Sequence, residues 1–150
     1  MADIKSKAAR SKNMAAIKGK DTKPEVYLRK LLFAKGFRYR TNSSLIPGHP
    51  DIWLRKYNTA IFVNGCFWHR HEGCKYTYIP KSRMEFWNSK FEKNVTRDLE
   101  VKKQLETHNI KCLVVWECTI KAMIRNEEYR KECISGIEQF LLSQSLYEEI

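Results

Sequence analysis

The sequence has few features that would place the chain in a membrane or outside the cell. No apolar run approaches the roughly 18 residues that a membrane-spanning helix needs, and the opening residues MADIKSKAARSKNM lack the apolar core of a signal peptide. The five cysteines are an odd number at irregular spacings, which suits reduced thiols or a metal site better than disulfides. We therefore expect a cytoplasmic protein that does not span a membrane.

Acidic residues are also scarce. The 17 Asp and Glu residues face 28 Lys and Arg residues, so the net charge is +11, which favours a polyanionic partner and nucleic acid first. Residues 1–20 hold six basic side chains and only one acid. We predict a basic DNA-binding arm over 1–20, in which Lys12 and Lys18 contact DNA, and a single domain over 21–150. A solvated tail is the alternative for the arm.

The hydrophobic pattern of residues 21–150 predicts an α/β fold with a mixed sheet flanked by helices. Asp21 or Thr22 can cap the first helix, and a capping box of the Ser-x-x-Glu type over 82–85 can open the second. The predicted elements are a helix over about 21–36, strands over 37–41, 51–55 and 59–64, a helix over 82–108, a buried strand over 110–118, and a last helix with Tyr129, Cys133, Ile137, Phe140 and Leu141 on its apolar face.

The stretch GCFWHRHEGC, residues 65–74, contains a possible metal site. Cys66, His71 and Cys74 have the spacing C-x4-H-x2-C, and Gly73 lets the chain curl tightly enough to present all three. Zinc prefers four Cys or His ligands in a tetrahedron. The alternative is two unpaired thiols and a surface histidine. We prefer a closed and therefore structural zinc site.

A fourth zinc ligand has to come from elsewhere in the chain. Cys118 is the best candidate, because it lies where the predicted strand 110–118 ends. Cys112 and Cys133 are more simply explained as small residues of the core.

If His71 binds zinc, His69 remains available as a general base. Asp51, at the start of a strand, could bind Mg²⁺ through its carboxylate, and Asp98 could orient the imidazole of His69. Glu25 is a further acid near a helix N-terminus. Each of these acids alone is most often a surface charge or a helix cap.

Several motifs together resemble one family. SKNMAAIKGKDTKPE, PGHPDIW, IFVNGCFWHRHEGC, EFW, KNVTRD and VVWEC occur in this order, at the spacing of the very-short-patch repair (Vsr) DNA mismatch endonucleases. The resemblance covers about residues 3–123. It implies a restriction-endonuclease-like fold and a Mg²⁺-dependent enzyme that nicks one strand of double-stranded DNA beside the thymine of a T·G mismatch.

The resemblance also implies roles for single residues. Asp51 would bind Mg²⁺ directly with the backbone carbonyl of Val63, and Glu25 would act through metal-bound water. His69 would be the base, oriented by Asp98. The structural zinc ligands would be Cys66, His71, Cys74 and Cys118.

Contacts with DNA follow from the same resemblance. Phe67, Trp68 and Trp87 match aromatic residues that wedge into DNA beside the mismatch, and Met14 matches an arm residue that enters the opposite groove. A T·G pair is weakly stacked, so this insertion costs less there than at a Watson–Crick step. Mismatch-repair proteins are further candidate partners, and we expect the chain to be a monomer.

Two positions and the length of one loop depart from the family pattern. Asn64 stands in the active site where members typically have a second histidine, and an amide cannot titrate. Val63 replaces a threonine found in some members, which leaves the carbonyl contact intact. The loop that leads to Cys74 is one residue longer than in some relatives, which weakens that match slightly.

Two other functions compete with a mismatch endonuclease. Loss of turnover through Asn64 would leave a zinc-stabilised module that binds mismatched DNA with weak or no nuclease activity. An HNH-type nuclease also combines zinc and histidine, but no second downstream histidine follows at finger spacing, and His108 lies at a polar helix end.

Overall fold

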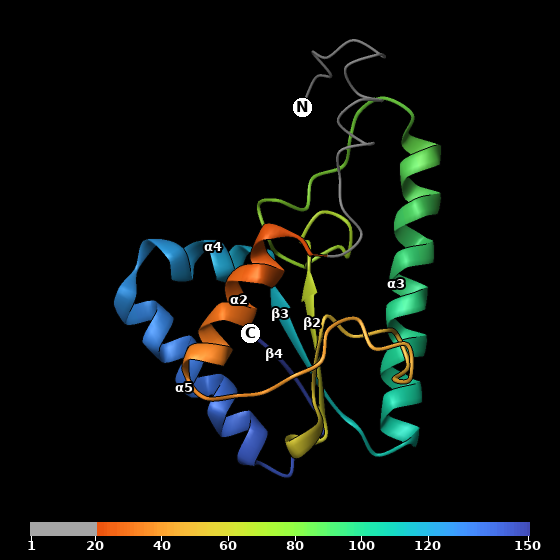
Figure 1. The fold of residues 1–150 in the computed structure, drawn as a ribbon. Coiled ribbons are helices and arrows are strands. Elements are labelled where there is room, and N and C mark those ends of the chain that lie inside the picture. Colours follow the sequence, from red (N-terminus) through yellow and green to blue (C-terminus); the bar gives the residue numbers. More distant parts are fainter. Residues whose placement is uncertain (1–20) are drawn as a thin grey trace.

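The computed structural model describes residues 21–150, so Lys12, Met14 and Lys18 of the predicted arm lie outside the described residues. The described chain forms a four-stranded sheet with helices on both faces (Figure 1). In chain order the elements are α2 (Lys23–Ala34), β1 (Ile52–Leu54), the 3-10 turn η1 (Arg55–Tyr57), β2 (Thr59–Asn64), α3 (Met84–Thr107), β3 (Lys111–Trp116), α4 (Glu117–Arg125), α5 (Glu127–Leu142) and β4 (Tyr147–Glu149).

The sheet is mixed and has the strand order β1-β2-β3-β4. β1 and β2 form the predicted antiparallel hairpin around η1, which Asn58 closes in a left-handed conformation at φ 51°. β2 pairs with β3, and β3 with β4, in parallel. Because parallel strands end at the same edge of a sheet, the residues that follow β2 and β3 meet there. The predicted mixed sheet flanked by helices is therefore confirmed.

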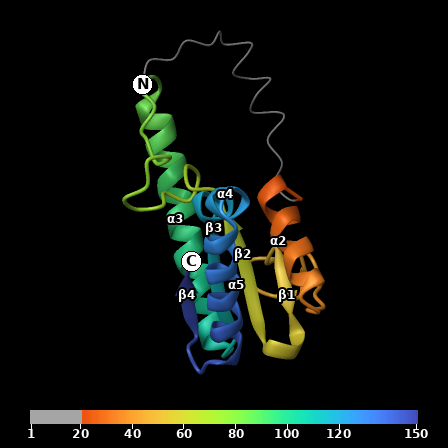
Figure 2. The same ribbon diagram turned by 90° about the vertical axis from the view of Figure 1, so that its left-hand side faces the viewer.

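The central strand β3 is buried on both faces, and its side chains alternate between two cores. Leu113 and Val115 belong to the core under α2, α4 and α5, whereas Val114 and Trp116 belong to the core that includes Leu105 of α3. Seen from the side, α3 lies behind the sheet and the other helices in front of it or beside it (Figure 2). The near-continuous run of apolar residues in β3 follows from this double burial.

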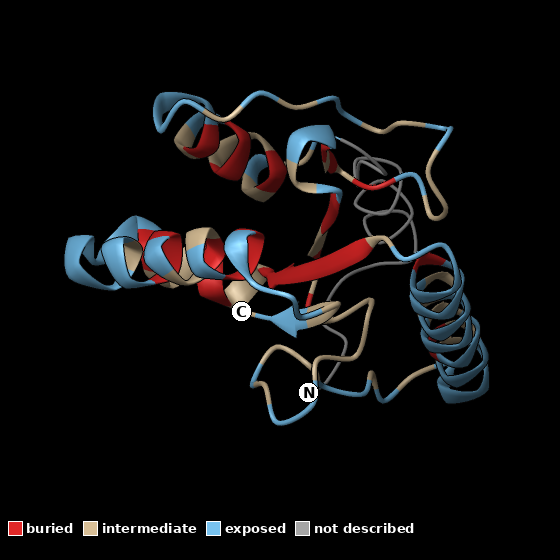
Figure 3. Cartoon of the chain, turned by 90° about the horizontal axis from the view of Figure 1, so that it is seen from below, coloured by how far each residue is buried: buried red, intermediate tan, exposed pale blue. Residues whose placement is uncertain are grey.

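Helix α3 is long and mostly exposed, and only Phe91 and Leu105 are buried in it (Figure 3). Its N-terminal half extends past the ends of β2 and β3 (Figure 1). A side chain on this half can therefore reach the loop that follows β2.

Four details of the predicted fold are wrong. Residues 37–41 form no strand, and only Arg40 makes a bridge, to Trp53, because β1 offers a short edge. The strand predicted over 110–118 ends at Trp116, so Cys118 lies in α4. The helix α4 was not predicted, and Asn126 separates it from the predicted last helix, α5, which Asn126 caps with its side chain. The N-cap of α3 is Arg83, without a side-chain hydrogen bond, in place of the predicted capping box.

The C-terminal strand β4 was not predicted. It adds a parallel edge to β3, with a backbone hydrogen bond of 2.9 Å from Ile150 N to Val114 O.

Within residues 21–150, none of the helices has the length and apolar character needed to cross a membrane.

Candidate active site and metal centre

The four predicted zinc ligands lie together at the edge of the sheet where β2 and β3 end. Cys66 and His71 come from the loop after β2, Cys74 from the same loop, and Cys118 from the first turn of α4. Their ligand atoms all lie within 4.8 Å of one another. Cys118 Sγ is 3.5 Å from His71 Nδ1, and the backbone N–H of Cys118 donates to Cys66 Sγ at 3.4 Å.

This group fits a tetrahedral zinc ion. Zinc–sulfur bonds of about 2.3 Å give a tetrahedron with edges of roughly 3.8 Å, comparable with the observed separations. Burial raises the pKa of the Cys66 thiol to about 12, so a thiolate there needs a compensating cation. The ring of His71 stacks on Trp116 with centroids 4.1 Å apart and an interplanar angle of 5°. The arrangement could hold a metal ion without an open ligand position.

Asp51 lies just before β1, where its carboxylate faces β2. The backbone N–H of Val63 donates to Asp51 Oδ2 at 2.7 Å. Burial and the negative charge of Glu25 raise the pKa of Asp51 to about 7, against the opposing hydrogen bond from Val63 and the charges of Arg29 and His69. A partly buried carboxyl group with a second acid nearby is a suitable ligand for a hard divalent cation.

Glu25 is buried in the first turn of α2, where Thr22 caps the helix. Its Oε2 accepts hydrogen bonds from the backbone N–H of Asp21 at 2.8 Å and from Arg29 at 3.2 Å. Glu25 is therefore a paired acid within electrostatic range of Asp51.

His69 and Asp98 form a side-chain pair across the loop and α3. His69 Nδ1 is 2.6 Å from Asp98 Oδ2, and Asn94 supports the same loop by donating to the carbonyl of Trp68 at 3.1 Å. A carboxylate only accepts hydrogen bonds, so this contact places the proton of a neutral imidazole on Nδ1 and a lone pair on Nε2. The Nε2 atom of His69 can therefore act as a base.

The three predicted wedge residues lie in one aromatic cluster, formed by Phe67, Trp68, Tyr78, Trp87 and Phe91. Phe67 is at its centre, with ring centroids 5.1 Å from Trp68 and 5.6 Å from Trp87. Phe91 is buried, whereas Phe67, Trp68 and Trp87 are half-buried. These side chains are therefore partly packed and partly available to a ligand.

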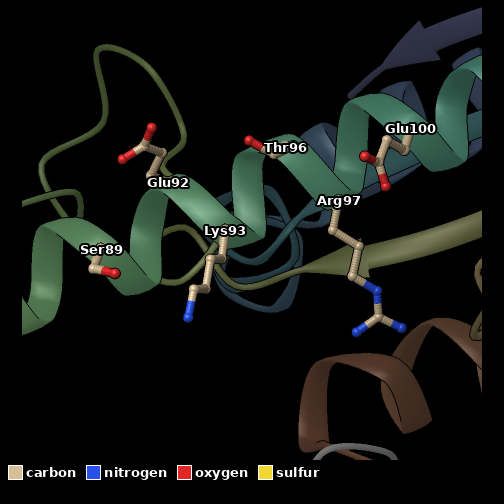
Figure 4. A pocket seen from close by; sticks show the side chains of 6 residues that line it. All are labelled: Ser89, Glu92, Lys93, Thr96, Arg97 and Glu100. Atoms are coloured by element: carbon tan, nitrogen blue, oxygen red, sulfur yellow. The ribbon is translucent and has the colours of Figure 1, made fainter.

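A shallow pocket of about 390 Å³ lies along α3 (Figure 4). Lys93 and Arg97 extend from the helix on the same side of it. The pocket is lined by Ser89, Glu92, Lys93, Thr96, Arg97 and Glu100. None of the predicted catalytic residues lines it, so this pocket is not the candidate active site.

Comparison with known proteins identifies the family. A family model described as DNA mismatch endonuclease Vsr matches residues 2–75. The type II nicking enzyme V.NmeAIP of Neisseria meningitidis serogroup A is 48% identical over 121 residues, which cover 81% of this chain and 86% of the relative. The chain belongs to the Vsr family of DNA mismatch endonucleases.

Two further relatives agree with this assignment. The DNA mismatch endonuclease Vsr of Escherichia coli K12 is 42% identical over 121 residues, which cover 81% of this chain and 77% of that protein. The type II nicking enzyme V.XorIIP of Xanthomonas oryzae is 36% identical over 132 residues, covering 84% and 96%. The predicted Vsr membership, the restriction-endonuclease-like fold and the class of DNA endonuclease are confirmed.

Asn64, which stands where Vsr proteins typically have a histidine, lies close to the candidate site. It is the last residue of β2, 9% exposed, and its register partner in β3 is Trp116. It therefore lies between the loop of His69 and the start of α4, at the same edge as the candidate site.

Two residues at this edge were not predicted from the sequence. Arg29 joins Asp21, Glu25 and the carbonyl of Asp51, and its only sequence signal is the i,i+4 spacing from Glu25. Trp116 lies within the VVWEC motif, but only the structure shows that it stacks on His71 and donates to Glu149 at 2.7 Å.

Proposed function

We propose that this Vsr-family protein is a Mg²⁺-dependent endonuclease that nicks one strand beside the thymine of a T·G mismatch in double-stranded DNA. The hydrogen bond between His69 and Asp98 is the observation that carries the proposal. Asp51, whose carboxylate accepts a hydrogen bond from the backbone N–H of Val63 in β2, is an acid near the end of the same strand. Together these residues supply a base and a candidate metal-binding acid, as hydrolysis of a phosphodiester requires.

In this mechanism His69 takes a proton from the attacking water through Nε2. Asp98 holds the ring and stabilises the imidazolium that forms. Asp51 and the Val63 carbonyl would hold Mg²⁺ directly, and Glu25 through water. The bound ion would supply positive charge to the scissile phosphate.

Cys66, His71, Cys74 and Cys118 would hold a structural zinc ion that fixes the loop carrying His69. Because His69 lies between Cys66 and His71 in the sequence, the position of its ring depends on this loop. Residues 1–20 act as the basic DNA-binding arm, and residues 21–150 form the nuclease domain.

Selection of the mismatch rests on the aromatic cluster. Phe67 and Trp68, near the start of the loop after β2, and Trp87, in the first turn of α3, are half-buried. Insertion between bases costs least where stacking is already weak, as at a T·G pair.

The substrate is double-stranded DNA bound by a monomer in the cytoplasm, and mismatch-repair proteins are further candidate partners.

The second candidate is a DNA-binding module with weak or lost nuclease activity, which the non-titrating Asn64 favours. The test is a nicking assay on two duplexes that differ only in a T·G or T·A pair, with each strand end-labelled separately. We expect Mg²⁺-dependent nicking of the thymine strand in the T·G duplex. Tight binding of the T·G duplex without nicking would favour the second candidate.

A further inference from the structure

Arg29 is an arginine of α2 with an exposed fraction of only 9%. Removing a guanidinium from water costs several kcal/mol unless charged or polar partners replace the water. Arg29 has three such partners: Asp21 Oδ1 at 2.6 Å, Glu25 Oε2 at 3.2 Å and the carbonyl of Asp51 at 3.5 Å. It therefore joins the residue before α2, the first turn of α2 and the segment that leads into β1.

The negative charge around Arg29 exceeds its own positive charge. Glu25 and Asp51 provide two carboxyl groups, and within residues 21–150 Arg29 is the cation paired with Glu25. Asp51 makes its side-chain hydrogen bond to Val63 and leaves its carboxylate without an ion pair in the same part of the chain. An additional cation at Asp51 would complete the charge balance.

The hydrogen bonds to Glu25 fall on one oxygen. Both Asp21 N–H and Arg29 donate to Oε2, and no donor within residues 21–150 bonds to Oε1. The carboxylate is therefore held by one oxygen while the other is left for a further ligand. Since Arg29 also contacts the backbone carbonyl of Asp51 at 3.5 Å, the same guanidinium links the Glu25 carboxylate to the segment that carries Asp51.

We propose that Arg29 is a positioning residue for the Mg²⁺ site: it holds Glu25 and the segment of Asp51 relative to each other, and it holds Glu25 by one oxygen, so that the other would remain available to the ion. This proposal rests on the proposed function. The role needs the planar fork of arginine, which can serve two acids and a carbonyl at once. The ammonium of lysine keeps the charge but not this geometry.

The alternative is that Arg29 only fastens α2 to the rest of the domain. The two roles differ in what they do to metal affinity. A residue that only stabilises the fold changes the melting temperature and leaves the Mg²⁺ affinity of the folded protein unchanged. A residue that orients metal ligands changes that affinity by about 10- to 100-fold.

The test is calorimetric titration of MgCl₂ into the full-length protein bound to a T·G duplex that is already nicked, so that no turnover occurs. The same titration with Asp51→Ala gives the background of ions bound by DNA. We expect one Asp51-dependent Mg²⁺ in the wild type and an affinity at least about ten-fold lower in Arg29→Lys. Excess Mg²⁺ should recover most of the nicking activity of Arg29→Lys.

Arg130→Lys is the matched control, because Arg130 also lies in a helix and donates to a carbonyl, that of Met123 at 3.0 Å. It should bind Mg²⁺ like the wild type. Asp21→Asn covers the case in which Arg29→Lys does not fold. It removes the charge that fixes Arg29, keeps the backbone donor to Glu25 and suits the left-handed conformation at φ 56°. It should weaken Mg²⁺ binding in the same direction.

Wild-type affinity in a folded Arg29→Lys variant, or in Asp21→Asn if the first variant does not fold, would overturn the role of Arg29 and leave the proposed function intact. Absence of any Asp51-dependent Mg²⁺ in the wild type would overturn both the metal site of the proposed function and the role of Arg29.

Discussion

His69 and Asp98 are joined by a contact of 2.6 Å between Nδ1 and Oδ2, although 29 residues separate them in the sequence. The exposed fractions of their side chains are 31% and 38%, so the pair is partly open to a ligand. The contact depends on the middle of α3, which carries Asp98, lying against the loop after β2, which carries His69. The base and the acid that orients it are therefore assembled from two elements.

Replacement of His69 by alanine should lower nicking of a T·G duplex by at least about 100-fold, the effect typical of losing a general base. Asp98→Asn should give a smaller loss, because it disturbs only the orientation and charge of the ring. Single-turnover nicking measures both effects. His108→Ala, at the exposed C-terminal end of α3, is the control and should nick normally. Nicking by His69→Ala at the wild-type rate would disprove this mechanism.

The zinc site should be structural. We expect about one equivalent of zinc per chain by elemental analysis, and loss of both zinc and cooperative unfolding in Cys66→Ser and Cys118→Ser. Cys133→Ala removes a buried thiol of α5 outside the ligand group and should keep the zinc. A well-folded wild-type protein without metal would refute a structural zinc ion.

Long, periodic segments were predictable from the sequence, and single contacts were not. The patterns around α2, the β1–β2 hairpin, α3 and β3 carry their own signal, because apolar residues recur at the spacing of each element. β4 carries almost none: Tyr147–Glu149 is short and polar, and it is fixed by backbone hydrogen bonds to β3.

In the candidate site, too, the residue pattern predicted one group of side chains and did not predict the contacts of Arg29. The parallel pairing of β2 with β3 brings Cys118 to the loop of Cys66, and cysteine and histidine spacing indicated this group. Arg29 has the sequence appearance of a surface arginine in α2. Its burial depends on the segment before β1 folding over it, which the local sequence does not encode.

The basic arm should contribute to the salt dependence of DNA binding. Deletion of residues 1–18 should make the plot of log K against log salt concentration shallower, by about 0.9 for each DNA phosphate that the shortened protein no longer neutralises. The measurement is fluorescence anisotropy over a range of KCl concentrations. An unchanged slope would show that the arm does not bind DNA. The deletion removes Lys5, Lys7, Arg10, Lys12, Met14 and Lys18.

Replacement of Trp68 by alanine should reduce the preference for mismatched DNA more than the affinity for a plain duplex. Stacking of an aromatic side chain on a base contributes about 1–3 kcal/mol to the binding free energy. The variant loses this stacking contribution, while its contacts with DNA phosphates remain. Competition binding with T·G and T·A duplexes measures the difference. Phe33→Ala, an exposed aromatic of α2, should leave the preference unchanged. Equal losses on both duplexes would assign Trp68 to packing within the aromatic cluster.

Nicking at limiting Mg²⁺ should depend on the protonation of Asp51. Burial and the charge of Glu25 raise the pKa of Asp51 from 3.8 to about 7, so below pH 7 the carboxyl group holds its proton in the metal-free protein. A metal ion must displace this proton, and the apparent Mg²⁺ affinity should fall by about ten-fold for each pH unit below 7. Excess Mg²⁺ competes with the proton and should move the midpoint of the pH–rate profile to lower pH.

The measurement is the nicking rate between about pH 5.5 and 8.5 at two Mg²⁺ concentrations, with DNA binding followed at each pH as the control. The Asp51 inflection should shift with Mg²⁺, because the ion and the proton share one carboxylate. An inflection that arises from a group without metal contact stays at the same pH. A profile that does not move between the two concentrations would show that Asp51 does not exchange a proton for the ion.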